Sequence, residues 1–216
     1  MHANTEIIQD LFLTFSNEKI SNIEKLPQAG SDRHYFRIHT PAKSFIATYG
    51  NNIKENETFI YFSEQFSGQN LATPQVYFVS EDGHAYIQED FGNTSLLNKL
   101  EDQGFTDEVY NLYKKSLQQL ASLQIKAHEV IDYKRCLTNA EFGKQAIMAD
   151  LLYFKYYFLD ALGHPYDKQK LIDDFEALST YLAHTEYKYF MFRDFQSRNI
   201  MITTDGDVRF IDYQGG

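Results

Sequence analysis

The residues best suited to chemistry lie in two short segments near the end of the sequence. Asp194 follows an apolar run, Asn199 comes five residues later, and Asp212 ends a further apolar run. Carboxylate and carboxamide oxygens are hard ligands of the kind that Mg²⁺ prefers. A carboxylate outside the metal shell can orient an attacking hydroxyl group or take its proton. Each residue alone fits a turn or a solvent-exposed strand end, but the three together favour phosphoryl transfer from a magnesium–nucleotide complex.

Other catalytic signatures are missing from the sequence. It has no G-x-S-x-G nucleophile elbow, no Walker A loop and no G-x-G-x-x-G motif, and its 7 histidines are scattered without zinc-like spacing. Cys136 is the single cysteine, so it cannot form an internal disulfide and is expected to fill a small apolar hole. This cysteine usage favours a reducing, cytoplasmic compartment.

Length and charge narrow the class of protein further. The 216 residues are enough for one domain or two small lobes, and a hydrophobic content of 43% argues against disorder. A net charge of −10 argues against a nucleic-acid-binding protein, although backbone N–H groups and a metal ion can still hold a small phosphate group. The apolar runs are too short to span a membrane, so we expect no membrane partner.

Hydrophobic periodicity predicts a strand-rich first part and a helical second part, with the boundary near residue 91. Strands are expected over 35–39, 44–49, 75–80 and 85–88, and helices over 4–19, 53–67, 94–101, 106–128, 138–162 and 167–184. A capping box at residues 138–141 is expected to open the fifth helix. Asp205-Gly206 between apolar runs predicts a closing hairpin. The aromatic segment 153–160 could stack on a base, but its helical spacing favours a place in the core.

Four segments together resemble a known family of kinases: GSDRHYFRI, YIQEDFGNTSL, RDFQSRNIMI and IDYQGG. They are similar to the aminoglycoside phosphotransferase and choline kinase group, and within it to the bacterial anomeric kinases of N-acetylmuramate and N-acetylglucosamine. The resemblance runs from about Gly30 to Gly216. It implies an α+β, bilobal protein-kinase-like fold with an antiparallel N-terminal nucleotide-binding lobe (residues 1–90) and a mainly helical C-terminal lobe (residues 91–216). The catalytic loop would be 192–202, and the metal-binding hairpin end 208–213.

The same resemblance assigns roles to individual residues. Asp194 would be the catalytic base, and Asn199 and Asp212 would bind Mg²⁺. The residues expected to hold ATP or another nucleoside triphosphate are the phosphate loop Gly30, Ser31, Asp32 and Arg33, then Arg37, and Glu89 and Phe91 of the hinge 88–91. Glu57 lies near the position of the family's helix glutamate.

The sequence departs from the family pattern at three places. Phe192 stands where a histidine is usual, Gln196 differs from the residue often found two after the base, and strand 44–49 lacks the phosphate-binding lysine. The amino-sugar kinases also tend to lack that lysine. Arg33 or Arg37 could supply the positive charge, or both could be ordinary surface arginines.

These residues leave more than one function open. The first is an ATP-dependent kinase that phosphorylates a sugar or amino-sugar hydroxyl; the alternative is a nucleotide-binding pseudokinase or regulatory module. A non-catalytic interaction domain would leave Asp194, Asn199 and Asp212 unexplained. The acceptor, the choice of ATP or GTP and the oligomeric state are open. Because related kinases continue for several helices after Asp212, we expect an incomplete C-terminal lobe with an exposed apolar face.

Overall fold

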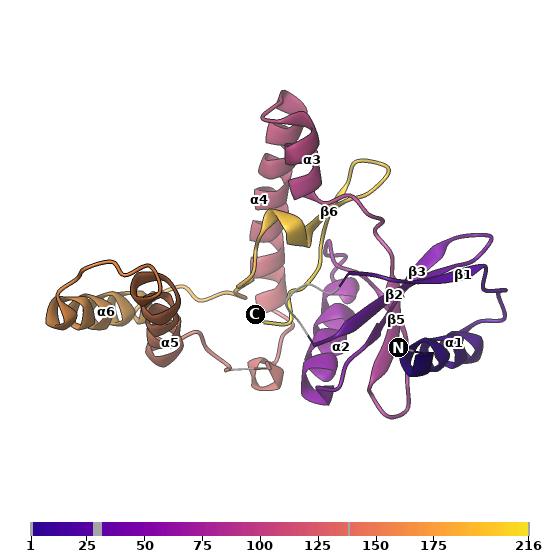
Figure 1. The fold of residues 1–216 in the computed structure, drawn as a ribbon, viewed down its shortest axis with the longest axis horizontal. Helices are drawn as coiled ribbons and strands as arrows, with labels where there is room; N and C mark the ends of the chain where they lie inside the picture. Colours follow the sequence, from indigo (N-terminus) through magenta and orange to yellow (C-terminus); the bar gives the residue numbers. More distant parts are fainter. Residues whose placement is uncertain (1, 28–31, 138, 216) are drawn as a thin grey trace.

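The first part of the chain forms a five-stranded antiparallel sheet (Figure 1). The structure is a computed structural model that describes residues 2–27, 32–137 and 139–215. The strand order is β1-β2-β3-β5-β4. The strands are β1 (Asn22–Lys25), β2 (His34–His39), β3 (Ser44–Tyr49), β4 (Val76–Val79) and β5 (Ala85–Glu89).

Two helices cover opposite faces of this sheet. Helix α1 (His2–Phe15) packs against the face that includes Ala85 and Ile87, whereas α2 (Ile53–Gly68) packs against the face that includes Tyr86. The alternation follows from the strand period of two, because successive side chains point to opposite faces. Asn52 caps α2 by accepting a hydrogen bond from the Glu55 N–H. The sheet therefore holds the start of α2 in a defined place.

The second part of the chain is mainly helical and ends in a short hairpin (Figure 1). Its elements are α3 (Leu96–Gln103), α4 (Asp107–His128), η1 (Tyr133–Arg135), α5 (Lys144–Phe154), the π-helix η2 (Lys155–Asp160), α6 (Lys168–Ala183), η3 (Ser197–Asn199), β6 (Ile200–Ile202) and β7 (Val208–Phe210). Strands β6 and β7 pair antiparallel, and Gly206 supplies the positive φ of 79° in the turn. The predicted hairpin and the predicted α+β fold class are confirmed.

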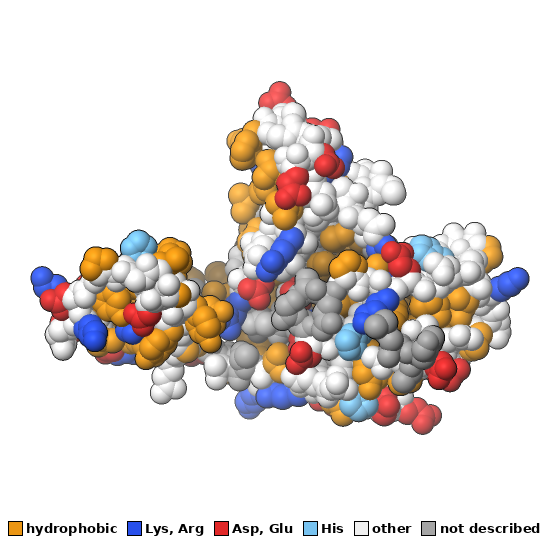
Figure 2. Space-filling model, in the orientation of Figure 1, with side chains coloured by type: hydrophobic (Ala, Val, Ile, Leu, Met, Phe, Trp, Pro, Cys, Tyr) orange, Lys and Arg blue, Asp and Glu red, His pale blue; other side chains and the backbone are white. Residues whose placement is uncertain are grey.

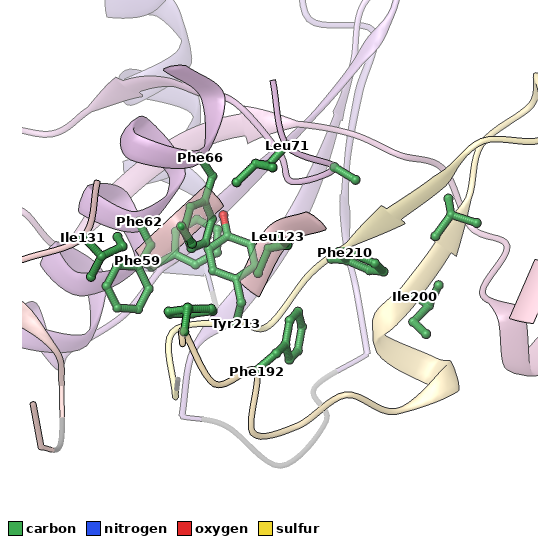
Figure 3. Packing of buried hydrophobic residues seen from close by; sticks show 14 of the residues in the cluster. Phe59, Phe62, Phe66, Leu71, Leu123, Ile131, Phe192, Ile200, Phe210 and Tyr213 are labelled. Carbon is green, nitrogen blue, oxygen red and sulfur yellow. The ribbon is translucent and has the colours of Figure 1, made fainter. Parts of the chain in front are cut away.

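An aromatic core joins the hairpin to α2 (Figure 3). Phe66 of α2 lies 5.3 Å from the ring of Tyr213, and Phe59 stacks on Tyr213 at 5.0 Å. The Tyr213 hydroxyl also shares a 2.6 Å hydrogen bond with Ser63 in this core. Because Tyr213 follows Asp212 directly, this packing fixes the chain at one of the predicted metal ligands.

Two predictions for residues 138–162 are wrong. Helix α5 begins at Lys144 and not at residue 138, with Gly143 at its N-cap and no side-chain cap; Thr138 lies outside the described residues. The aromatic segment is not core either: Tyr153 is 64% exposed and Tyr157 is 69% exposed. Its helical spacing does produce an apolar face, but the described chain places no layer over it. Strand β1 is a further element that the periodicity did not predict.

Residues 144–183 form what we call the helical arm. Helices α5 and α6 pack chiefly against each other, and the arm stands apart from the sheet and α4 (Figure 1). Apolar side chains gather on its surface (Figure 2), among them Phe154, Phe158 and Leu162, which are 43–60% exposed. The lobe boundary near residue 91 and an incomplete C-terminal lobe both stay predictions. Among the described helices, none has the length and apolar character needed to cross a membrane.

Candidate functional site

The segment that carries Asp194 is a loop held from both ends. Phe192 is buried and packs edge-on against Phe195, Phe210 and Tyr213, so this phenylalanine anchors the loop by apolar contact. Downstream, the Asn199 side chain donates from Nδ2 to the Asp194 carbonyl at 3.0 Å. These two contacts fix the backbone on which the Asp194 carboxylate sits.

The hairpin brings Asp212 to the same place. The Ile211 N–H donates to the Asn199 carbonyl at 3.0 Å, so the residue before Asp212 is bonded directly to Asn199. A Cβ built on Gly215 would lie 3.9 Å from Oδ2 of Asp194. The structure therefore gathers Asp194, Asn199 and Asp212, as their spacing predicted, although their roles stay predictions.

Asp212 adopts an unusual backbone conformation. Its φ is +65°, in the left-handed region that non-glycine residues seldom occupy and that costs about 1–2 kcal/mol. Such conformations persist where the surroundings over-determine them, and they cluster at functional sites. Here the hydrogen bond at Ile211 and the buried Tyr213 ring hold the residue on both sides. From this position the Asp212 carboxylate contacts Arg33, which also contacts Glu55 of α2.

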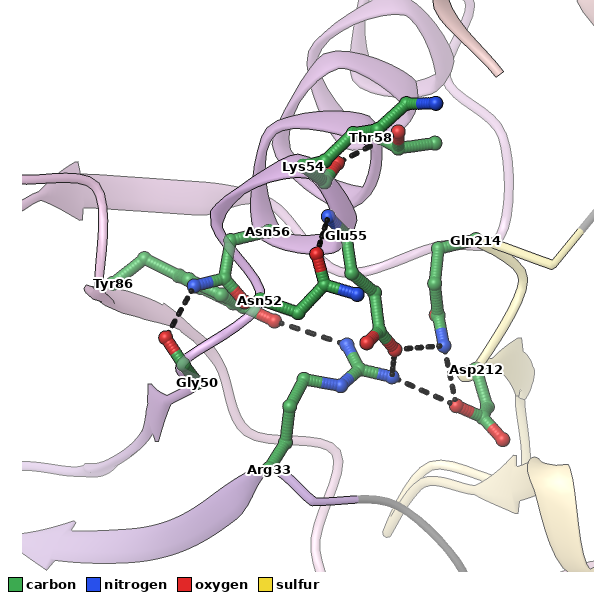
Figure 4. A network of polar contacts seen from close by, with 10 residues as sticks. All are labelled: Arg33, Gly50, Asn52, Lys54, Glu55, Asn56, Thr58, Tyr86, Asp212 and Gln214. Carbon is green, nitrogen blue, oxygen red and sulfur yellow. Dashed lines mark hydrogen bonds and ion pairs between the residues drawn. The ribbon is translucent and has the colours of Figure 1, made fainter. Parts of the chain in front are cut away.

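Arg33 meets that carboxylate at the centre of a polar cluster (Figure 4). Its Nη2 lies 3.2 Å from Oδ1 of Asp212 and 3.2 Å from Oε1 of Glu55 in α2, and its Nη1 lies 3.4 Å from the Tyr86 hydroxyl. Gln214 donates from Nε2 to the same Asp212 oxygen at 2.9 Å. Arg33 is only 2% exposed, so the interpretation of a surface arginine is wrong.

The buried groups of this cluster hold fixed charge states. Burial lowers the pKa of Arg33. Tyr86 and Tyr35, followed by Glu55 and Asp212, raise this pKa by a larger amount, so it lies above its ordinary value. Burial also raises the pKa of Tyr35 and Tyr86, despite the nearby guanidinium. The cluster therefore keeps one permanent cation beside two neutral phenols at neutral pH.

Arg37 serves a different part of the site. Its Nε and Nη2 bind the two oxygens of Asp90 at 2.7 and 3.1 Å, Nη2 also donates to the Gly92 carbonyl at 3.0 Å, and Nη1 donates to Asn93. Burial raises the pKa of Asp90, but hydrogen bonds from Arg37, Ser44 and Gly92 outweigh it, and the pKa lies below its usual value. Arg37 thus ties the sheet to the predicted hinge.

The other predicted nucleotide contacts are spread around this site. Gly30 and Ser31 lie outside the described residues, and Asp32 is exposed. The Glu89 N–H donates to the Gln75 carbonyl at 2.9 Å, so this hinge group is already paired and is not available to a base. Phe91 is buried beneath the guanidinium of Arg209.

Sequence reasoning missed Glu55 and Gln214, and it singled out Glu57, which lies outside the polar cluster. Glu57 is exposed on α2, whereas Glu55 faces Arg33. The signal was present in the helical period: residues 55, 59, 62 and 66 follow one another at steps of four, three and four along one face. Glu57 is out of phase with the three buried phenylalanines at the last three of these positions.

The donor chemistry of the loop fits a magnesium ion. Nδ2 of Asn199 is bonded to the Asp194 carbonyl, so Oδ1 of Asn199 is the side-chain atom that would contact a cation, together with the carboxylate of Asp212. Within the described ranges, no cluster of three or more His, Cys, Asp or Glu side chains could hold a metal. Two protein ligands leave most of an octahedral shell to phosphate oxygens and water, which is the usual pattern for Mg²⁺ with a nucleotide.

No family model matches the chain, and no curated protein matches it in sequence. Its fold, however, is similar to that of several solved kinases. Choline kinase LicA from Streptococcus pneumoniae aligns with a TM-score of 0.63 and 12% identity, over 100% of this chain and 69% of that one. The streptomycin–ATP–APH(2")-IIa ternary complex aligns with a TM-score of 0.59 and 12% identity, over 99% of this chain and 70% of that one. A choline kinase from Cryptosporidium parvum aligns with a TM-score of 0.57 and 16% identity, over 97% of this chain and 64% of that one.

These likenesses define a class by fold. The chain has the protein-kinase-like fold shared by aminoglycoside phosphotransferases and choline kinases, as the sequence resemblance implied. At 12–16% identity the likeness concerns the fold alone. The chain spans 64–70% of the length of these three kinases.

Proposed function

We propose that the chain is an ATP-dependent phosphotransferase that acts on a hydroxyl group of a small molecule, with a sugar or amino sugar as the acceptor. The observation that carries the proposal is the meeting of the loop and the hairpin at Asn199. One side of Asn199 bonds to Asp194, and its carbonyl accepts from the residue before Asp212. A base and two metal ligands would then act on one reaction centre.

The proposed mechanism gives each residue one task. Asn199 and Asp212 would hold Mg²⁺, which when bound neutralises charge on the phosphates. Asp194 orients the acceptor hydroxyl group for in-line attack on the γ-phosphorus. The new acceptor O–P bond forms as the bond to the bridging β,γ-oxygen breaks, ADP leaves, and the hydroxyl proton passes to the Asp194 carboxylate. Positioning and charge neutralisation supply most of the rate.

A cavity beside this loop is suitable for the acceptor. It has a volume of about 360 Å³ and is bordered by Arg193, which precedes Asp194 in the catalytic loop, and by Gly215, two residues beyond the hairpin end. Tyr133, Asn139 and Glu141 add an aromatic ring and polar groups to its wall. Small-molecule pockets have about this size and this mixture of aromatic and hydrogen-bonding groups. A sugar offers matching hydroxyl groups and an apolar ring face.

The proposal is tested by ATP turnover against a panel of sugars and amino sugars. Asp194→Asn keeps the shape of the side chain and removes the base, so the rate should fall by about 10²- to 10⁴-fold. Asp102→Asn, on exposed helix α3, serves as the matched control and should keep full activity. Wild type and Asp194→Asn that are equally inert on every acceptor, while ATP still binds, would refute the proposed transfer.

That outcome would favour the second candidate, a nucleotide-binding pseudokinase. The observation behind it is strand β3, Ser44–Tyr49, which carries no lysine. A pseudokinase predicts stabilisation by ATP without transfer, and ligand at 100 times its Kd would stabilise the fold by about 2.7 kcal/mol. A thermal melt with and without ATP, run beside the turnover assay, separates the two functions.

A further inference from the structure

On the face of the sheet that meets the polar cluster, strand β3 carries no cation. In β3, Phe45 and Ala47 face α1, so Ile46 and Thr48 point to the opposite face, toward α2 and Tyr86. Neither Ile46 nor Thr48 is charged. Positive charge for nucleotide phosphates must therefore come from another element.

The described cations around the sheet differ sharply in their surroundings. Arg37 is bound on both carboxylate oxygens of Asp90. The Nζ of Lys43 lies over the rings of Phe45 and Tyr77, on the side of the sheet covered by α1. Lys54 is exposed, and its side chain points away from Arg33 (Figure 4). Arg33 is the cation that reaches the Asp212 carboxylate.

We propose that Arg33 binds the β- and γ-phosphates of the nucleotide in place of a strand lysine. This inference rests on the proposed function, because it assumes that a magnesium–nucleotide complex occupies the site. Oδ1 of Asp212 accepts from Arg33, whereas the second oxygen points away from the cluster (Figure 4). When Asp212 turns to the metal, the Nη2 group exchanges this carboxylate for a phosphate oxygen. A guanidinium suits this exchange because its planar fork matches carboxylate and phosphate alike.

Glu55 and Gln214 act as positioning residues for this exchange. Glu55 holds Nη2 of Arg33 at 3.2 Å from a different side than Asp212, so the guanidinium keeps one partner throughout. Gln214 links the two acids, since its Nε2 lies 2.9 Å from Asp212 and 3.5 Å from Glu55. A Cβ on Gly50 would lie 3.0 Å from Cγ of Arg33, so the arginine stem has little room to shift. Within Arg33, the guanidinium group at the end of the side chain is therefore the part that can exchange one hydrogen-bond partner for another.

The test is calorimetric binding of Mg²⁺–ADP and of adenosine, which lacks phosphates, to the full chain. Arg33→Gln should weaken ADP binding by about tenfold or more, the effect of a lost charge-assisted hydrogen bond, with adenosine affinity within about twofold. Glu55→Gln should weaken ADP binding less and also leave adenosine unchanged. Lys43→Gln, on the opposite face, should bind both ligands like the wild type.

Two further variants guard against loss of folding. Arg33→Gln leaves the Glu55 charge partly buried, so the double variant Arg33→Gln/Glu55→Gln removes both charges and keeps a neutral pair able to hydrogen-bond. Arg33→Lys keeps the charge and should recover part of the ADP affinity. Equal ADP binding by wild type and the folded Arg33 variants would overturn the inference alone. A wild type that binds no ADP at any Mg²⁺ concentration would overturn the inference and the proposed function together.

Discussion

The ion pair between Arg37 and Asp90 should be a main support of the sheet. The Arg37 and Asp90 side chains are 6% and 2% exposed, and the pair is bidentate, at 2.7 and 3.1 Å. Asp90→Ala leaves the guanidinium buried without its counter-charge, and removing one partner of such a pair costs about 3–5 kcal/mol. For a chain of this size, that corresponds to a fall in Tm of about 6–20 °C. Urea titration at pH 7 measures the free energy directly.

The pH dependence of this pair has a definite sign. The pKa of Asp90 is lowered in the folded protein, so its contribution is complete above the unfolded value of about 3.9 and is lost as the pH falls through the lower folded value. The difference in stability between wild type and Asp90→Asn should be full at pH 6 and should shrink below about pH 4. Asp102→Ala, at an exposed site, should change stability by no more than about 0.5 kcal/mol. The reasoning would be refuted if Asp90→Ala lost less than about 1 kcal/mol of stability, or if the stability difference between wild type and Asp90→Asn did not change with pH.

The remaining predictions concern local structure and one thiol. Ser95→Ala removes the reciprocal capping box of α3 and should cost about 1 kcal/mol in a denaturant titration, whereas no loss would contradict the role of the cap. Gly104→Ala, at φ +67° and ψ −160° with open space around it, should cost about 1–3 kcal/mol, because this backbone region is essentially confined to glycine. Gly68→Ala, at the end of α2, should instead stabilise the fold by up to about 1 kcal/mol in the same denaturant titration. Burial raises the pKa of Cys136, so this thiol should react with Ellman's reagent more slowly than a free thiol at pH 8, and equal rates would show that it is accessible.

The sequence was most informative where period and turn chemistry agree with the tertiary structure. The hairpin at Asp205-Gly206 was predictable because a short turn with a glycine at positive φ is determined by the residues of the turn themselves. The grouping of Asp194, Asn199 and Asp212 was predictable because the hairpin returns the chain to the loop. Helix α5 was mispredicted because residues 138–141 fit a capping box locally, whereas the described residues 139–143 do not adopt helical geometry.

The polar cluster was hard to predict for a different reason. Arg33 contacts residues more than 20 positions away in sequence, Glu55 and Asp212 among them, and nothing local in the sequence marks such partners. Whether Arg33 or Arg37 faces the predicted metal ligands depends on the register of β2 against β3 and on the course of the chain before β2. Exposure of the aromatic face at 153–160 is also a tertiary matter, because periodicity predicts an apolar face but not what covers it.

The weak attachment of the helical arm has a consequence for amide hydrogen exchange. Among the described residues, links between the arm and the rest of the chain include two connecting segments and the exposed ion pair of Arg193 with Asp150, at 2.8 Å. Exposed pairs contribute little, about 0–1 kcal/mol, so the arm is expected to open as its own cooperative unit. Its amides should exchange at a lower free energy than those of β3 and β5 in the central sheet. Because Arg193 precedes Asp194, each such opening also releases one of the bonds beside the proposed base.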